Sequence, residues 1–98
     1  MENVKRYSSF IKRIITAPEP IRRKLLKTSN PNIIKAISEI VYNIIHKNIA
    51  VSGVTLKKLR KFKKVFYKLV DTKKTWSVRK KILIDNLDCL AALSVLFK

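Results

Sequence analysis

Three residue types that build many functional sites are almost missing from this sequence of 98 residues, which has one glycine, one cysteine and one histidine. A single glycine excludes a glycine-rich phosphate-binding loop. Cys89 alone forms no disulfide within the chain and no zinc site built from several cysteines. His46 alone leaves no histidine pair for a metal site or for acid–base catalysis within one chain. We therefore expect no enzyme, no metal and no cofactor.

Acidic residues are scarce as well. The chain has 6 Asp and Glu against 23 Lys and Arg, which gives a formal net charge of +17 and an isoelectric point near 10.5. Repulsion among like charges opposes folding into a compact state, and binding to a polyanion relieves it while releasing condensed counterions. The composition therefore favours a nucleic-acid partner.

The positive charge is most concentrated between Lys57 and Lys81. This stretch of twenty-five residues holds twelve Lys and Arg but only one acid, Asp71. Nine apolar and aromatic residues are interleaved among them, mostly at helical spacing, which a disordered basic tail would lack. The stretch therefore predicts a folded helical surface of one charge sign.

The hydrophobic fraction of 47% is ordinary for a folded protein and predicts one domain or one domain with a short arm. A chain of this size buries only about 60–65% of its unfolded surface, so we expect a marginal core that a second copy or another partner stabilises. No secretory signal is expected, because Lys12 and Arg13 break the first apolar run, and the apolar run after Asp88 is too short to span a bilayer.

Apolar residues at i, i+3, i+4 and i+7 predict an all-α fold, a small bundle of four to five short helices. Asn30 and Pro31 are expected to begin the central helix as its N-cap and first residue. A strand is the competing interpretation of that segment, because many of its residues are β-branched. The predicted helices cover residues 3–16, 20–28, 31–47, 53–70 and a final segment from Trp76 that continues or restarts at Asp85.

The predicted helix over 53–70 carries the sharpest candidate site. Lys57, Lys61, Lys64 and Lys68 would lie along one face of a continuous helix, about 5–6 Å apart, a spacing suited to a phosphate backbone. Lys58, Arg60 and Lys63 flank its apolar stripe. A solvated surface is the alternative, but surfaces usually mix charge signs, and no acid lies between Glu39 and Asp71. We favour contact with phosphates by Lys57, Lys58, Arg60, Lys61, Lys64 and Lys68.

A second basic cluster surrounds Trp76. The tryptophan has two interpretations: it stacks on an unpaired base, or it anchors the last helix to the core, which we favour. The six arginines are scattered along the chain, and lysine, a point charge without a fork of donors, is far more frequent. This composition predicts contact with the backbone rather than with base edges, and hence binding largely independent of sequence. The cluster would extend the interface through Lys73, Lys74, Arg79, Lys80 and Lys81.

The C-terminal stretch LAALSVLF also has two interpretations. It completes the core of the bundle, or it docks on a protein shell or a membrane surface. We favour the core, because a chain of this size needs every apolar residue to fold.

The order of segments resembles a family of small basic proteins encoded by Polinton (Maverick) elements and adintovirus-like DNA viruses of animals. The resemblance covers roughly residues 10–97 and is carried by LLK, IIKAISEIVYNII, an N-x-x-x-S connector at Asn48 and Ser52, KKLRKFKK, LVD, and the block V-R-K-K-I-L. In that family the last block is typically followed by a Gly-Gly-Phe element. Here the matching stretch, residues 85–90, has no glycine, so no role tied to that element is carried over.

Proteins of this family are regarded as candidate virion core proteins, similar to the adenovirus core peptide that condenses DNA. The resemblance implies packaging without catalysis, a location in the virion and the host nucleus, and a capsid protein as a further partner. It supplies no active-site residues.

Together these observations predict a basic amphipathic N-terminal helix over residues 1–17 and a helical nucleic-acid-binding domain over residues 18–98. The expected function is sequence-independent binding and condensation of double-stranded DNA. The alternatives are a membrane-active or capsid-docking helical module, an RNA-binding structural protein, and a helix-turn-helix regulator.

Overall fold

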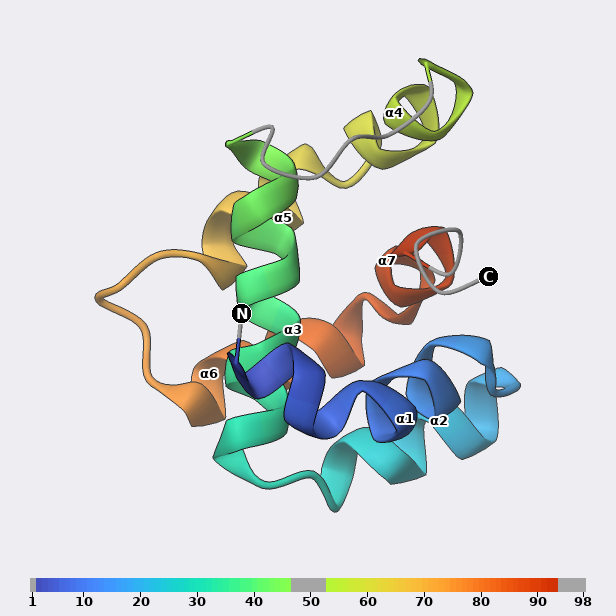
Figure 1. The fold of residues 1–98 in the computed structure, drawn as a ribbon, viewed down its shortest axis with the longest axis vertical. Helices are drawn as coiled ribbons and strands as arrows, with labels where there is room; N and C mark the ends of the chain where they lie inside the picture. Colours follow the sequence, from blue (N-terminus) through green and yellow to red (C-terminus); the bar gives the residue numbers. More distant parts are fainter. Residues whose placement is uncertain (1, 47–52, 94–98) are drawn as a thin grey trace.

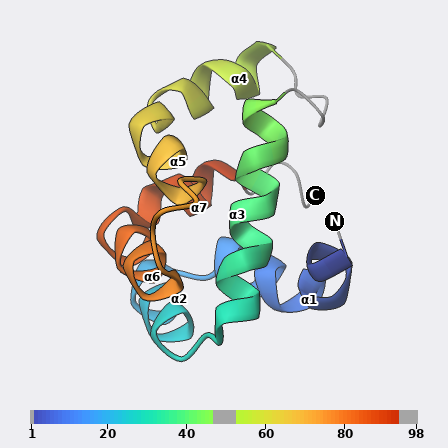
Figure 2. The ribbon, with the colours of Figure 1, turned by 90° about the vertical axis from the view of Figure 1, so that its left-hand side faces the viewer.

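A helix through the middle of the molecule organises the fold. The computed structural model describes residues 2–46 and 53–93, and within these ranges it holds seven helices and no strand. Helix α3 (Pro31–Ile45) is central, with α1 (Glu2–Thr16) on one side and α5 (Lys63–Leu69) on the other (Figures 1 and 2). The prediction of a small all-α bundle is confirmed, although the described helices outnumber the expected ones because two of those are broken.

Helix α3 forms where its sequence signals place it. The Asn30 side chain accepts a hydrogen bond from the Ile33 amide at 3.1 Å, and Pro31 is the first helical residue. Such a cap contributes about 1 kcal/mol. Most of the helix surface is buried, which is why its β-branched residues are tolerated. The alternative interpretation of a strand is therefore wrong, and the core residues of α3 are Ile33, Ile34, Ala36, Ile37, Ile40, Val41 and Ile44.

Helix α1 packs across α3 and bends at Tyr7, where φ is −109° and ψ is 15°. Its apolar side chains pack on α3, since Ile11, Ile14 and Ile15 are buried in the same cluster as the α3 core and Tyr7 and Phe10 pack against that cluster. Helix α2 (Glu19–Lys27) follows after Pro18, with Pro20 in its first turn. The segments 1–17 and 18–98 therefore share one core in the part of the chain described.

The expected helix over 53–70 is broken, and this prediction is wrong in its length. Helix α4 (Gly53–Arg60) ends at a turn, and α5 begins at Lys63. At the turn Phe62 adopts φ −105° and ψ 16°, and its amide donates to the Leu59 carbonyl at 3.0 Å. The cause is packing: α4 lies against α7 (Leu87–Ala92), whereas α5 lies against α3 and α6. The two halves of the expected helix thus have different main partners.

Helix α6 (Trp76–Asp85) is capped by Thr75, whose hydroxyl accepts from the Val78 amide at 3.3 Å. Asn86 then interrupts the helix with φ −135° and ψ 52°, and α7 restarts at Leu87. Leu87, Leu90 and Leu93 are buried. The apolar stretch up to Leu93 thus completes the core, while residues 94–98 lie outside the described part, as does the connector over 47–52.

Candidate nucleic-acid interface

Seven exposed cations follow one another on α4, the 61–62 turn and α5. We call them the basic ridge: Lys57, Lys58, Arg60, Lys61, Lys63, Lys64 and Lys68. Apolar side chains between these cations pack both helices against the core, where Leu59, Phe66 and Leu69 are buried. Helix α4 lies at the end of the molecule away from α1 and α2 (Figures 1 and 2). The ridge therefore projects from a fixed scaffold at one end of the protein.

The turn at 61–62 changes how the ridge is organised. Lys57 lies on α4, Lys61 in the turn, and Lys64 and Lys68 on α5. The expectation of a single row along one continuous helix is therefore wrong. All four lysines are exposed, but they lie on two helices of different direction and on the turn between them. Lys63, which the sequence analysis placed beside the apolar stripe and left out of the interface, is exposed as well, with Nζ 6.0 Å from the centre of the Tyr67 ring.

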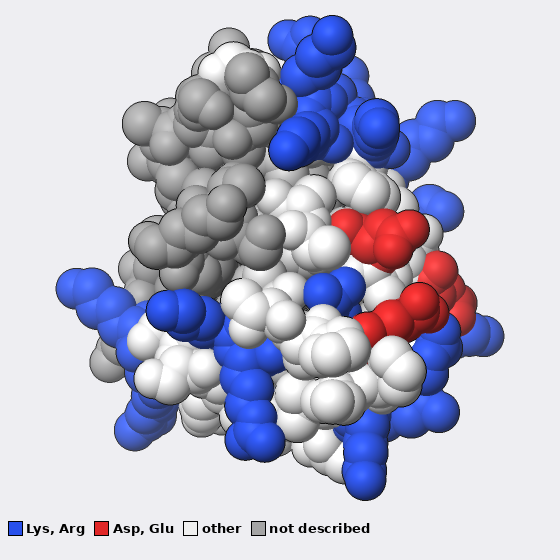
Figure 3. Space-filling view, turned by 90° about the vertical axis from the view of Figure 1, so that its right-hand side faces the viewer, with Lys and Arg blue, Asp and Glu red and all other residues white. Residues whose placement is uncertain are grey.

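No acid neutralises the ridge within the described ranges. The one ion pair found there joins Arg23 to Glu19 at 3.5 Å, on α2. Three acids instead gather elsewhere, around a cavity of about 240 Å³ that Glu19, Asp85 and Asp88 line. Figure 3 shows this separation on one face of the molecule, with the acidic side chains between a basic group at the α4 end and other cations below.

Asp71, the single acid of the basic stretch, shapes a loop. Its Oδ1 accepts from the Lys73 amide at 2.9 Å, and its carbonyl accepts from the Lys74 amide at 3.1 Å. These bonds close the turn between α5 and α6. Lys73 is exposed and Lys74 half-buried on this loop.

Arg79 points inward, although it was expected to contact phosphate. Only 6% of the residue is exposed. Its guanidinium lies over the Trp76 ring, 4.1 Å from the ring centre, and donates to the Asp71 carbonyl at 2.6 Å. Burial lowers the pKa of Arg79, and the nearby Asp71 opposes that shift. In this structure Arg79 joins α6 to the end of α5, and Trp76 is a half-buried partner of that contact.

Lys80 and Lys81 have different surroundings although they are neighbours. The Lys80 ammonium donates to the Lys27 carbonyl at 3.2 Å and to the Ser29 carbonyl at 2.5 Å, which ties α6 to the end of α2. Lys81 is exposed. Of the second predicted cluster, the structure thus leaves Lys73 and Lys81 facing solvent, while Lys74 and Lys80 are half-buried and Arg79 is buried.

Arg22, on α2, is a buried cation. It is 8% exposed, and its guanidinium donates to the carbonyls of Ile14, Ile15, Ala17 and Leu87 at 2.8–3.1 Å. The negative end of the α1 dipole stabilises this charge. Only the structure reveals that Arg22 is buried. The apolar residue before it, Ile21, is 50% exposed, so the hydrophobicity of this segment does not predict which side chain turns inward.

The residues most often used as metal ligands or nucleophiles have ordinary structural surroundings in the described ranges. No set of three or more His, Cys, Asp and Glu there is placed to hold a metal ion. His46 ends α3, with its ring 4.2 Å from that of Tyr42. Cys89 is buried, and burial raises the pKa of its thiol to about 12. Among the described helices none is long and apolar enough to cross a membrane.

Comparison of the chain with known protein families, with characterised proteins and with solved structures finds no match. The resemblance to the core proteins of Polinton elements therefore stays a prediction.

Proposed function

We propose that the protein binds double-stranded DNA without regard to sequence and neutralises its phosphate charge. The observation that carries this proposal is the basic ridge, seven exposed cations held on two packed helices with no acid paired to them in the described ranges. Lysines predominate in the ridge, with Arg60 the one arginine. Point charges contact phosphates without reading base edges, so the ridge supports binding of any sequence.

The size and charge of the protein support condensation. Duplex DNA carries one charge per ~1.7 Å of helix axis, so a net charge of +17 matches about 29 Å of duplex. The protein measures 33 × 30 × 26 Å. Copies lying side by side along a duplex would thus neutralise nearly all of its charge, which removes the repulsion between neighbouring duplexes. A base pair carries two phosphates, so a net charge of +17 matches about 8 to 9 base pairs. We expect compaction of long DNA to begin near this ratio of protein to DNA, as measured by light scattering.

The alternative of a membrane-active module needs apolar side chains that are free to insert. Ile11, Ile14 and Ile15 of α1 and Leu87, Leu90 and Leu93 near the C-terminus are buried in the core instead. This arrangement supports the nucleic-acid proposal over the membrane one. A role in a virion core, and with it a location in particles and the host nucleus, is proposed from the resemblance of the sequence alone.

The decisive experiment is a salt titration of DNA affinity. Replacing Lys57, Lys61, Lys64 and Lys68 by glutamine should reduce the slope of log K against log [salt] by about 3 to 4, because each phosphate contact contributes about 0.9. The matched control replaces four exposed lysines on α1 and α2, namely Lys5, Lys12, Lys24 and Lys27. Duplex RNA in a parallel arm separates DNA binding from a general preference for polyanions. An unchanged slope in the ridge variant, or an equal loss in the control, would remove the ridge from the interface.

A further inference from the structure

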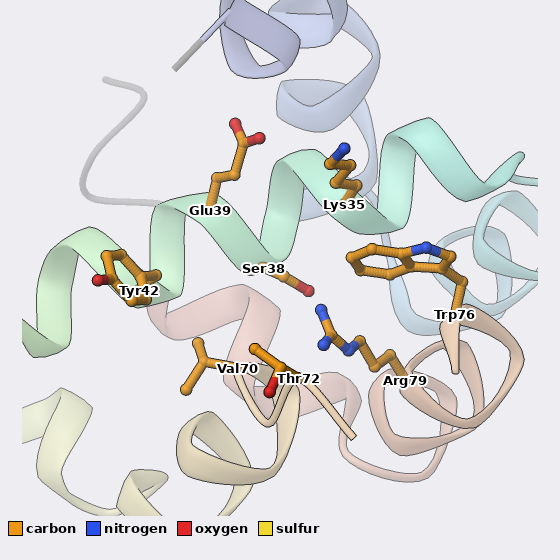
Figure 4. Close-up of a pocket in the computed structure, with 8 residues that line it drawn as sticks. All are labelled: Lys35, Ser38, Glu39, Tyr42, Val70, Thr72, Trp76 and Arg79. Atoms are coloured by element: carbon orange, nitrogen blue, oxygen red, sulfur yellow. The ribbon is translucent and has the colours of Figure 1, made fainter. Parts of the chain in front are cut away.

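A pocket opens beside α3, away from the side chains of the basic ridge. Its volume is about 340 Å³, and α3, the 71–75 loop and the start of α6 surround it (Figure 4). This volume is near the lower end of the range for small-molecule sites, about 300–1,000 Å³. The pocket has room for one small chemical group such as a single ring system. The residues that line it are Lys35, Ser38, Glu39, Tyr42, Val70, Thr72, Trp76 and Arg79.

Two buried polar atoms at the pocket have no hydrogen-bond partner among the described residues. They are Oγ of Ser38 and Nε of Arg79, in residues that are 5% and 6% exposed. The Ser38 hydroxyl and the Arg79 guanidinium point toward one another across the floor of the pocket (Figure 4). A buried polar group without a partner costs free energy, and native structures almost always satisfy it with protein, water or ligand. A guest with both an acceptor and a donor would satisfy the two atoms together, since the hydroxyl both donates and accepts while Nε only donates.

Two aromatic rings line the pocket. Trp76, backed by the Arg79 guanidinium at 4.1 Å, stands on one side. Tyr42 stands toward the other end of the pocket and is 49% exposed. Aromatic rings and guanidinium planes are the surfaces on which unpaired bases stack. These walls therefore favour a planar guest.

The lining carries both charge signs, since Glu39 and Lys35 both belong to it. Lys35 is exposed, and the lysines Lys73 and Lys74 follow the lining residue Thr72 in the loop. Phosphates on either side of an inserted base would meet these side chains.

We propose that this pocket accepts a single unpaired nucleobase, with its edge on Ser38 and Arg79 and its phosphates near Lys35 and the 71–75 loop. The proposal rests on the proposed nucleic-acid binding and adds to it a preference for single-stranded or extruded bases. Arg79, turned away from the outer surface, would then contact a base rather than a phosphate.

The chain offers a direct probe, because Trp76 is its single tryptophan and lines the pocket. The full chain is titrated with a single strand of about eight thymidines, a length within the usual site size. Two parallel arms use a blunt duplex, which has no unpaired base, and inorganic polyphosphate, which has no base. We expect saturable quenching of Trp76 fluorescence by the single strand, and little or none by the duplex or by polyphosphate at the same salt concentration.

Three variants locate the effect. Ser38→Ala removes one unsatisfied hydroxyl and should fold at least as well, yet bind the thymidine strand about five- to ten-fold more weakly. Tyr42→Ala should weaken it about ten-fold through lost stacking. Tyr67→Ala is the matched control, because Tyr67 is 51% exposed but lies on α5 outside this pocket. Its affinity should stay within two-fold, roughly, of the unmodified chain.

The outcomes separate this proposal from the proposed function. Duplex binding with the expected salt slope, but no quenching of Trp76 by the thymidine strand, overturns the pocket proposal and leaves the ridge intact. The pocket proposal is also overturned if the Ser38→Ala and Tyr42→Ala variants show the same quenching of Trp76 by the thymidine strand as the Tyr67→Ala control. Absence of binding to both nucleic acids in dilute buffer overturns both proposals.

Discussion

Two sets of basic residues in this protein have contrasting surroundings. The seven cations of the basic ridge face solvent, whereas Arg22, Arg79 and Lys80 turn inward and donate to main-chain carbonyls. Most of those carbonyls lie at or just beyond the end of a helix, where the last turn leaves carbonyls without partners. The comparison teaches that basic side chains close together in the sequence can differ: some face solvent, and others bind carbonyls that a helix end leaves unpaired.

The scarcity of glycine explains why basic side chains bind the carbonyls near helix ends. Helices often end with a glycine in the left-handed conformation, which lets the main chain bond its own last carbonyls. The one glycine here, Gly53, begins a helix, and the residues that end α2 and α5, Thr28 and Val70, keep negative φ values of −92° and −95°. Their neighbouring carbonyls are instead bound by Lys80 and Arg79.

The largest effect that tests this comparison comes from neighbouring arginines on α2. Arg22→Ala leaves four carbonyls without their donor and should lower the free energy of unfolding by about 3 kcal/mol or more. Arg23→Ala removes one exposed ion pair with Glu19 and should cost less than about 0.5 kcal/mol. Urea unfolding monitored by circular dichroism measures both. Equal stabilities of the two variants would contradict the structural role of Arg22, and Arg22→Lys should lie between them.

A smaller effect separates Lys80 from Lys81. Lys80→Met should cost about 1 kcal/mol of stability through its lost bonds to the Lys27 and Ser29 carbonyls, whereas Lys81→Met should stay within about 0.5 kcal/mol. DNA affinity should show the reverse pattern. Lys81→Met should reduce the salt slope by about 0.9, and Lys80→Met should leave it unchanged. If the two variants changed both properties alike, the division into inward and outward cations would fail at this position.

The smallest expected effect concerns pH and the buried thiol. Burial raises the pKa of Cys89 to about 12, above the value near 8.5 of an unfolded chain. The protonated thiol thus favours the folded state fully below about pH 8.5, and this stability is lost as pH rises toward 12. The loss should reach roughly 0.8 kcal/mol at pH 9, where exposed lysines remain charged. Cys89→Ala should remove this contribution of the thiol to the pH dependence of stability. Denaturant unfolding at about pH 7 and about pH 9, on either side of the thiol pKa of an unfolded chain, measures the difference.

The secondary structure was largely predictable from local signals. The predicted Asn30 cap and the predicted position of Pro31 agree with the structure, because a cap depends only on residues within one turn. The break at 61–62 was not predictable in this way. The apolar stripe continues through Phe62 without interruption, and the turn arises because α4 and α5 pack on different helices.

The candidate interface was predictable only as a region. Its boundaries along the chain follow from the absence of acids between Glu39 and Asp71. Which cations face outward depends on distant segments: Lys80 reaches carbonyls fifty-one and fifty-three residues away. No spacing within α6 distinguishes Lys80 from Lys81 in advance. The pocket beside Trp76 likewise needs α3 and the 71–75 loop, which are distant in the sequence.

The sequence by itself determined the charge sign, the helical class and the central position of α3, because these follow from composition and from the period of apolar residues along one segment. Only the tertiary structure decided the turn at 61–62, the inward direction of Arg22, Arg79 and Lys80, and the pocket under Trp76. The physical reason is that a helix end or a long side chain takes its partner from whichever segment packs beside it, and that partner is set by the folded arrangement of the whole chain.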